Sequence, residues 1–163
     1  MSRRPLNITV SAHTSASPEQ VLDAVTDFTA RRPRLWPNVK ARYLNVHELG
    51  PDNADVTEGL FIIGVFWERE RYDWSEPGRV TSVVMDSNVL VPGCRFEVTA
   101  APSEQGGAEV TMHLHRTFRR GLKGRFGSTV NRLFGRRGWA SYLRKVLRNL
   151  EREPAPTTPP VTI

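Results

Sequence analysis

Short turns between strand-like segments limit the fold of this chain more than any other feature. Between residues 40 and 118, six runs alternate apolar and polar side chains, and turn residues such as Ser75, Pro77 and Gly78 separate them. The expected strands cover residues 40–49, 54–63, 65–74, 79–86, 95–101 and 108–118. Strands this close leave no room for the helical crossover that parallel pairing requires. The sequence therefore predicts an antiparallel meander.

The segment before the meander predicts one strand and two short helices. Residues 6–13 alternate strictly between apolar and polar side chains, as a half-buried strand does. Ser17 can cap a helix that starts at Pro18, and Gln20 stands where a capping box needs Glu or Gln. A second short helix is expected over residues 29–35, before Trp36.

A long amphipathic helix is expected after the meander, over residues 122–152. Its apolar residues recur at steps of three or four, with one gap of seven. Arg137 occupies the missing position, and Gly135 and Gly138 beside it predict a looser or kinked helix. At a rise of 1.5 Å per residue the helix would be about 45 Å long. No other expected element is long enough to cover the concave face of a coiled sheet.

These elements together predict an α+β protein. A curved antiparallel sheet of six to seven strands would surround the long C-terminal helix, with the two short helices after the first strand. A coiled sheet that grips one helix leaves space at its open end, which predicts an apolar pocket. We expect a single domain over residues 1–153. The tail over 154–163 contains four prolines and is expected to be disordered.

Several kinds of site are not expected. The single cysteine, Cys94, excludes an internal disulfide and a cysteine-based zinc site. His113 and His115 are expected on the solvent face of the last strand rather than at a metal. No nucleophile, phosphate-loop or dinucleotide motif occurs, so we predict no catalytic residue, no metal and no cofactor. Without a signal core or an apolar run of membrane-spanning length, the chain is expected in the cytoplasm.

The positive charge is concentrated in the last quarter of the chain. Residues 116–152 hold twelve Lys and Arg and one acid, whereas the remaining residues hold eleven basic and sixteen acidic side chains. Two interpretations remain open. Only three of the 23 basic residues are Lys, which is compatible with an arginine-rich composition displayed on a solvated helix. Alternatively, the helix contacts an anionic membrane or another acidic partner. Nucleic acid is the weakest candidate because no RNA-reading aromatic motif occurs.

The order of several motifs resembles one superfamily. The motifs are Ser17-Pro18-Glu19-Gln20-Val21, Leu35-Trp36-Pro37-Asn38-Val39, Trp67-Glu68-Arg69, Trp74-Ser75-Glu76-Pro77-Gly78-Arg79, Gly107-Ala108-Glu109-Val110 and the closing basic helix. From about Leu6 to Leu150 the chain resembles the SRPBCC superfamily of START-like, helix-grip proteins, and within it the polyketide cyclase/dehydrase and lipid-transport branch. The resemblance implies a helix-grip fold and a cavity for lipids, polyketides or other apolar ligands. It implies no single reaction.

The expected ligand-binding residues are mainly aromatic. They are Trp36, Phe61, Trp67, Glu68, Phe96, Met112, Phe126, Val130, Phe134 and Arg137. The sequence leaves open which face of the strand over residues 65–74 points into the cavity. A shift of one residue would turn Phe66 and Tyr72 inward in place of Trp67. A carboxylate of Glu68 or Glu70 paired with Arg137 could anchor polar groups of the ligand. Alternatively, Arg137 extends to water or marks a bend in the helix.

Three functions are compatible with the sequence. The favoured one is non-catalytic binding or transport of a small hydrophobic molecule in an internal cavity. The alternative is an enzyme similar to polyketide cyclases or dehydratases. The third is an interaction module that uses the basic helix on anionic membrane or nucleic acid. The oligomeric state stays open.

Overall fold

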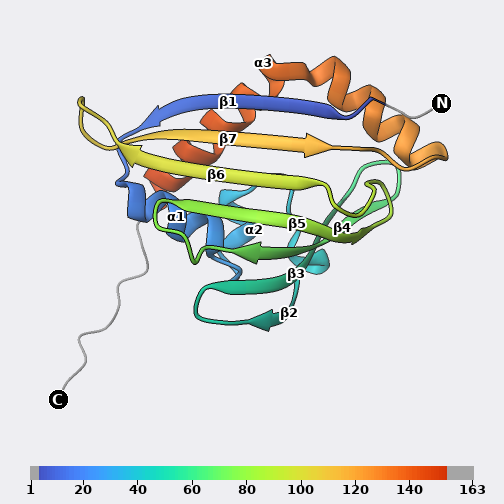
Figure 1. Ribbon diagram of the computed structural model, residues 1–163, viewed down its shortest axis with the longest axis horizontal. Coiled ribbons are helices and arrows are strands. Elements are labelled where there is room, and N and C mark those ends of the chain that lie inside the picture. The colour runs from blue at the N-terminus through green and yellow to red at the C-terminus, as the bar shows by residue number, and fades with distance from the viewer. Residues whose placement is uncertain (1–3, 154–163) are drawn as a thin grey trace.

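The computed structural model describes residues 4–153, which form an antiparallel seven-stranded sheet and its covering helices (Figure 1). The elements are β1 (Leu6–Thr14), α1 (Pro18–Thr26), α2 (Arg32–Leu35), a 3-10 turn (Ala41–Tyr43), β2 (Asn45–Leu49), β3 (Asn53–Phe61), β4 (Val65–Asp73), β5 (Arg79–Ser87), β6 (Arg95–Pro102), β7 (Ala108–Arg116) and α3 (Leu122–Arg152). The strand order is β1-β7-β6-β5-β4-β3-β2. The predicted meander and helix-grip fold are confirmed.

Two local predictions can be compared directly with the structure. The capping box of α1 is present, because Ser17 Oγ accepts from Gln20 N at 3.2 Å and Ser17 N donates to Gln20 Oε1 at 2.8 Å. The strand predicted over residues 40–49 is too long. Residues 41–43 form the 3-10 turn, and β2 begins only at Asn45.

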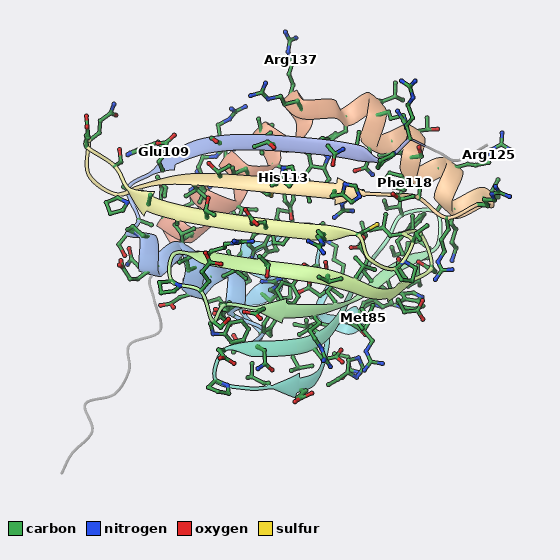
Figure 2. All side chains as sticks on the ribbon, viewed as in Figure 1. Met85, Glu109, His113, Phe118, Arg125 and Arg137 are labelled. Atoms are coloured by element: carbon green, nitrogen blue, oxygen red, sulfur yellow. The ribbon has the colours of Figure 1, made fainter. Side chains whose placement is uncertain are left out.

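The two histidines of β7 contact β1 on the outer face of the sheet, as predicted. His113 Nδ1 is 2.6 Å from Thr9 Oγ1, and His113 points away from α3 (Figure 2). His115, two positions along the same strand, shares this face, and its Nδ1 is 2.7 Å from Asn7 Oδ1. Met112 is fully buried on the opposite face. Within residues 4–153 no group of three or more His, Cys, Asp or Glu could hold a metal ion.

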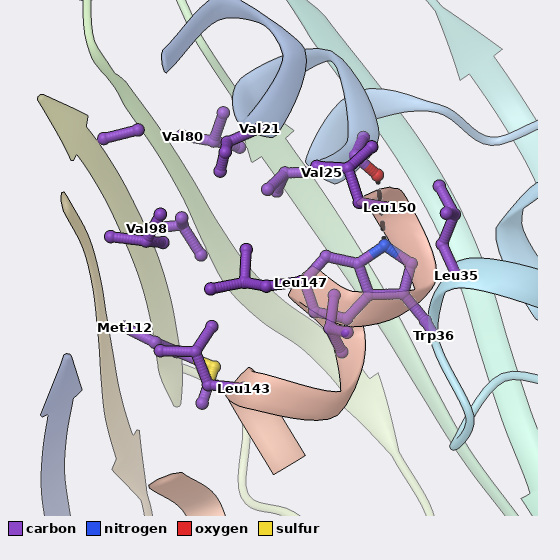
Figure 3. Packing of buried hydrophobic residues seen from close by; sticks show 14 of the residues in the cluster. Val21, Val25, Leu35, Trp36, Val80, Val98, Met112, Leu143, Leu147 and Leu150 are labelled. Atoms are coloured by element: carbon purple, nitrogen blue, oxygen red, sulfur yellow. Dashed lines mark hydrogen bonds between the residues drawn. The ribbon is translucent and has the colours of Figure 1, made fainter. Parts of the chain in front are cut away.

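The main core lies between the sheet, α1 and the second half of α3 (Figure 3). Leu143 and Leu147 of α3 face Val21 and Val25 of α1 across this core. Trp36 closes it at one end, and its indole Nε1 donates to Ala24 O at 3.0 Å. The aromatic ring is therefore buried with its one polar atom satisfied.

A kink divides α3 at Gly135. This residue has φ 56° and ψ −166°, a conformation that is open essentially to glycine alone. Before the kink, Phe126 packs on a separate, smaller core that includes Phe66 and Phe118. After the kink, α3 packs on the main core. The predicted interruption of the helix is confirmed, and it separates two packing environments.

Two further predictions concern the membrane and the tail. No helix within residues 4–153 combines the length and the hydropathy needed to cross a bilayer. The tail expected over residues 154–163 lies outside the described residues.

Candidate ligand-binding site

A cavity opens between the inner face of the sheet and α3. It is lined by Arg32, Trp36, Asn38, Val39, Glu58, Gly59, Leu60, Phe66, Glu68, Glu70, Tyr72, Phe96, Met112, Leu114, Arg116, Trp139 and Tyr142. The space between atoms is about 630 Å³ when the opening to solvent is included. The cavity volume itself is about 70 Å³, which is room for a few water molecules. Its wall combines aromatic rings with five charged side chains.

Arg32 of α2 lies at the centre of the polar part of this wall. Only 2% of the residue is exposed. Its Nε donates to Glu58 Oε1 at 2.6 Å, Nη1 to Val25 O at 2.5 Å, and Nη2 to the Tyr72 hydroxyl at 3.1 Å. Burial opposes the charge of Arg32, but the attraction of Glu58, Tyr72 and Glu70 and the hydrogen bond to Glu58 together outweigh it and raise the pKa of the guanidinium. Arg32 therefore remains a cation inside the protein.

Glu70 of β4 is the carboxyl group whose environment is most unusual. Its Oε2 accepts from the Tyr72 hydroxyl at 2.9 Å, and its Oε1 accepts from Ser82 Oγ at 2.9 Å. Burial, followed by the negative charges of Glu68 and Glu58, raises the pKa of Glu70 to about 7. Near neutral pH this carboxyl group is therefore about half protonated and can both donate and accept a proton.

Tyr72 joins Glu70 to the arginine. Burial, and then the carboxylates of Glu58 and Glu70, raises the pKa of Tyr72 well above its ordinary value. The hydroxyl thus stays protonated and keeps donating its hydrogen bond to Glu70. Its ring lies edge-on to Phe28, with centroids 4.9 Å apart.

The other end of the cavity is formed by β7 and α3. Arg116 Nη1 is 3.3 Å from Glu68 Oε1, and the Arg116 guanidinium carbon lies 5.3 Å from the centre of the Trp139 ring. The Trp139 Nε1 is buried and, within the described part of the chain, has no hydrogen-bond partner. Tyr142 donates a hydrogen bond to Asn38 Oδ1, and burial raises the pKa of this phenol. The unpaired Trp139 N–H can donate to an oxygen atom of a bound molecule.

Four of the predicted residues line this cavity. Trp36, Glu68, Phe96 and Met112 come from four different parts of the chain and meet there. The open question about β4 is also answered. Phe66 and Tyr72 line the cavity and Trp67 does not, because adjacent residues of a strand point to opposite faces. With Glu68 inward, Trp67 has to point outward.

Other predicted ligand-binding residues do not line this cavity. Phe61 is 62% exposed at the end of β3, beyond the part of the strand that faces the cavity. Phe126 packs on Phe66, with ring centroids 5.9 Å apart, in the smaller core. Val130 and Phe134 are exposed, because the first half of α3 turns other residues toward the sheet.

Arg137 also does not reach the cavity. It follows the kink and projects away from the sheet (Figure 2). The cations that pair with carboxylates of the cavity wall are Arg32, with Glu58, and Arg116, with Glu68. Glu68 of β4 does line the cavity, but its cation partner comes from β7.

Sequence reasoning missed several residues of the wall. Arg116 could have been found, since it continues the inward alternation of Met112 and Leu114 on β7. Trp139 lies two positions after Arg137, and only the kink brings it to the cavity. Arg32 gave no signal, because a polar residue in a four-residue helix normally lies in water.

A comparison with family sequences agrees with this geometry. A sequence model of the family described as polyketide cyclase / dehydrase and lipid transport matches residues 5–153. The chain belongs to this family. The match runs from the start of β1 to the end of α3, and so includes every element that lines the cavity. Membership supports a small hydrophobic ligand for this START-like protein, and leaves open whether the ligand is only bound or also converted.

Solved structures share the fold of this family member. An aromatase/cyclase from Streptomyces sp. R1128 has a TM-score of 0.72 at 13% identity, with 91% of this chain and 95% of that chain covered. A protein from Thermus thermophilus has a TM-score of 0.71 at 14% identity, with 90% and 98% covered. A START superfamily protein from Mycobacterium smegmatis has a TM-score of 0.64 at 15% identity, with 91% and 97% covered. At these identities the likeness shows the fold alone.

One curated protein matches a shorter stretch of the chain. The peptide methionine sulfoxide reductase MsrA of Azotobacter vinelandii is 36% identical over 67 residues, which are 40% of this chain. The matched stretch spans only 31% of that protein. Cys94 is buried here, and burial raises the pKa of its thiol, so the chain has no activated thiol. A reductase activity is therefore not inferred.

Proposed function

We propose that this protein binds a small, mainly aromatic molecule that carries hydroxyl or carbonyl oxygens, and that it acts as a carrier or sensor of that molecule. One observation supports this most strongly: the cavity surrounds polar groups with aromatic rings. Trp36 and Phe96 provide flat apolar surface, whereas Arg32 and Trp139 offer donors to an oxygen. A purely aliphatic ligand would leave the buried Trp139 N–H without a partner. The family, described as polyketide cyclase / dehydrase and lipid transport, supports a hydrophobic ligand.

The ligand requires more room than the closed cavity provides. Ligand pockets commonly enclose ~300–1,000 Å³, whereas the cavity volume here is about 70 Å³. The kink at Gly135 lies next to Trp139, and Gly138 lies between them. We expect the wall to open there, because the two halves of α3 pack on different cores and can move separately.

Titration of the purified protein with a hydroxyanthraquinone and with oleate tests this proposal. Because Trp36 and Trp139 line the cavity, bound ligand should quench tryptophan fluorescence. The hydroxyanthraquinone should bind more tightly than oleate, and native mass spectrometry should find one molecule per chain. Tighter binding of oleate, or no binding of either probe, would contradict the proposed ligand class.

A matched pair of variants locates the site. Phe96→Ala removes a ring from the cavity wall and should weaken hydroxyanthraquinone binding by about tenfold, the equivalent of one partly buried ring contact. Phe61→Ala removes the same ring at an exposed position and should leave binding unchanged. Equal effects of the two substitutions would show that the probe binds outside the cavity.

A cyclase or dehydratase activity is the second candidate, and the ionisation of Glu70 favours it. Elimination of water from a β-hydroxyketone removes a proton from the α-carbon and adds one to the leaving hydroxyl. A carboxyl group with a pKa of about 7 can perform both steps in turn. If the protein is an enzyme, Glu70→Gln should abolish dehydration of a model β-hydroxyketone, followed by absorbance of the enone, and should leave binding intact. A wild-type protein that binds the compound and returns it unchanged is a carrier.

A further inference from the structure

The first half of α3, residues 122–134, presents most of its apolar side chains to solvent. Leu122 is 83% exposed and Leu133 is 84% exposed, and Phe134 is also exposed. The residues that this half buries are instead Gly124 and Gly127. A Cβ at Gly127 would lie 2.7 Å from Val89 Cγ2, so the glycine allows close approach to the smaller core. This part of the helix is held by Phe126 and its glycines, and it exposes its other large apolar residues.

A second group of exposed apolar residues lies beside the start of α3. Phe61, Ile62 and Ile63 form the turn between β3 and β4, and at least half of each residue is exposed. Lys123 Nζ donates to Val65 O at 3.1 Å and thereby fixes the helix next to this turn. We call the combined set, Phe61, Ile62, Ile63, Leu122, Leu133 and Phe134, the apolar rim.

The part of the apolar rim on α3 is accompanied by positive charge only. Between residues 110 and 150 the chain has no Asp or Glu. Arg125 and Arg137 project outward from α3 (Figure 2), and within residues 4–153 neither they nor Arg136 has an ion-pair partner. These guanidinium groups therefore remain free to pair with phosphates or carboxylates from outside.

We propose that the apolar rim and the cations around it dock on a membrane that contains anionic lipids. Transfer of apolar side chains into the boundary between head groups and acyl chains lowers the free energy. Neighbouring Arg and Lys side chains attract the anionic head groups. Two other occupants fit less well. A second copy of the chain would bring the same positive charge to the contact, and a nucleic acid backbone offers nothing to four aliphatic side chains.

The location of the rim gives docking a consequence for the cavity. Leu60 and Phe66, on either side of the β3–β4 turn, line the cavity, and Trp139 lines it just after the first half of α3. Docking would therefore bring this end of the cavity close to the bilayer. The proposal itself does not depend on the identity of the cavity ligand, because it is tested with empty protein and lipid vesicles.

Co-sedimentation with vesicles tests the docking directly. Vesicles of phosphatidylcholine mixed with phosphatidylserine should bind the protein about tenfold or more tightly than phosphatidylcholine alone at low salt, and added salt should reduce the difference. No sedimentation with the mixed vesicles at low salt would overturn the proposal. Equal binding of single-stranded RNA at the same salt would also overturn it, because it would show attraction to any polyanion.

Two matched pairs of variants then locate the surface. Leu133→Glu should reduce vesicle binding at least about tenfold, whereas Leu49→Glu, which adds the same charge at a 64% exposed position of β2, should change it little. The melting temperature, measured by circular dichroism, should be the same for both, since both sites are exposed. If the wild type forms a dimer that Leu133→Glu dissociates, the rim is a subunit interface and the membrane proposal fails.

The second pair reverses charge at two places along α3: beside the apolar rim, at Arg125 and directly after the kink, and on the later turns of the helix. Arg125→Glu combined with Arg136→Glu should abolish binding to the mixed vesicles. Arg144→Glu combined with Arg148→Glu makes the same change in net charge on exposed positions after the kink, and should retain most of the binding. Equal loss in both double variants would mean that net charge, and not this surface, attracts the vesicles.

Discussion

The two halves of α3 have the same sequence period but different roles. After the kink, Leu143, Leu147 and Leu150 are buried between the sheet and α1 and form much of the main core. Before the kink, Leu122 and Leu133 recur at comparable steps, yet both are exposed, and this half contacts the protein through Phe126 and two glycines instead. A period of three to four residues thus predicts a helix in both halves. It does not predict which face of the helix is buried.

This difference indicates that the two halves of the helix have different functions. The second half contributes stability, because its apolar side chains are removed from water. The first half retains exposed apolar surface of the kind that marks an interaction site. The cavity lies where the two environments meet, with Trp139 of the second half and Phe66 of the smaller core in its wall.

The largest expected effect on stability comes from shortening a leucine in the second half of α3, and the same change in the first half is the comparison. Leu147→Ala should lower the free energy of unfolding by about 2–5 kcal/mol, because it leaves a cavity in the main core. Leu133→Ala should change it by less than about 0.5 kcal/mol, because this side chain is exposed already. Urea denaturation measures both. Similar losses would show that the first half is packed in solution and would contradict the comparison.

A smaller effect on the unfolding free energy is expected from the ionisation of Glu70 in the cavity between the two halves of α3. The unfolded chain releases the Glu70 proton near the ordinary pKa of 4.5, whereas the folded protein keeps it until about pH 7. The folded state thus binds more protons in this window. The contribution of Glu70 to stability is complete below pH 4.5 and is lost as the pH rises through 7.

Glu70→Gln isolates this contribution. The wild type should lose, relative to the variant, at most about 3 kcal/mol of unfolding free energy between pH 4.5 and 7. Urea denaturation at several pH values gives the difference. Parallel pH profiles for the two proteins would show that Glu70 titrates at its ordinary value and would remove the argument for acid–base chemistry.

The smallest expected effect on stability comes from the close contact between Gly127, in the first half of α3, and Val89. Gly127→Ala introduces a Cβ too close to Val89 and should cost about 1–3 kcal/mol. Because the kink separates the two halves, amide hydrogen exchange should accelerate in residues 122–134 more than in residues 139–150. Uniform acceleration along α3 would mean that the helix unfolds as one unit.

The sequence predicted the elements well because their signals are local. Ser17 and Gln20 are three residues apart and define the start of α1 by themselves. The strand period predicted that Glu68 or Glu70 would face the cavity, and both do. The same period could not choose between Trp67 and Phe66, because it leaves open which of the two faces is turned inward.

The candidate site was less predictable because its contacts are distant in sequence. Arg32 pairs with Glu58 across 26 residues, and Arg116 pairs with Glu68 across 48. Arg137, the cation that the helical pattern singled out, was the wrong partner because the kink turns it outward.

The sequence by itself determined the order of strands and helices, the antiparallel pairing, the break near Gly135 and the concentration of positive charge on α3. These follow from turns, caps, periods and composition, which act within a few residues. Only the tertiary structure decided which faces are buried, which charges meet in the cavity and which half of α3 is exposed. Those outcomes depend on how elements pack against one another, and packing is set by side chains that the chain brings together from far apart.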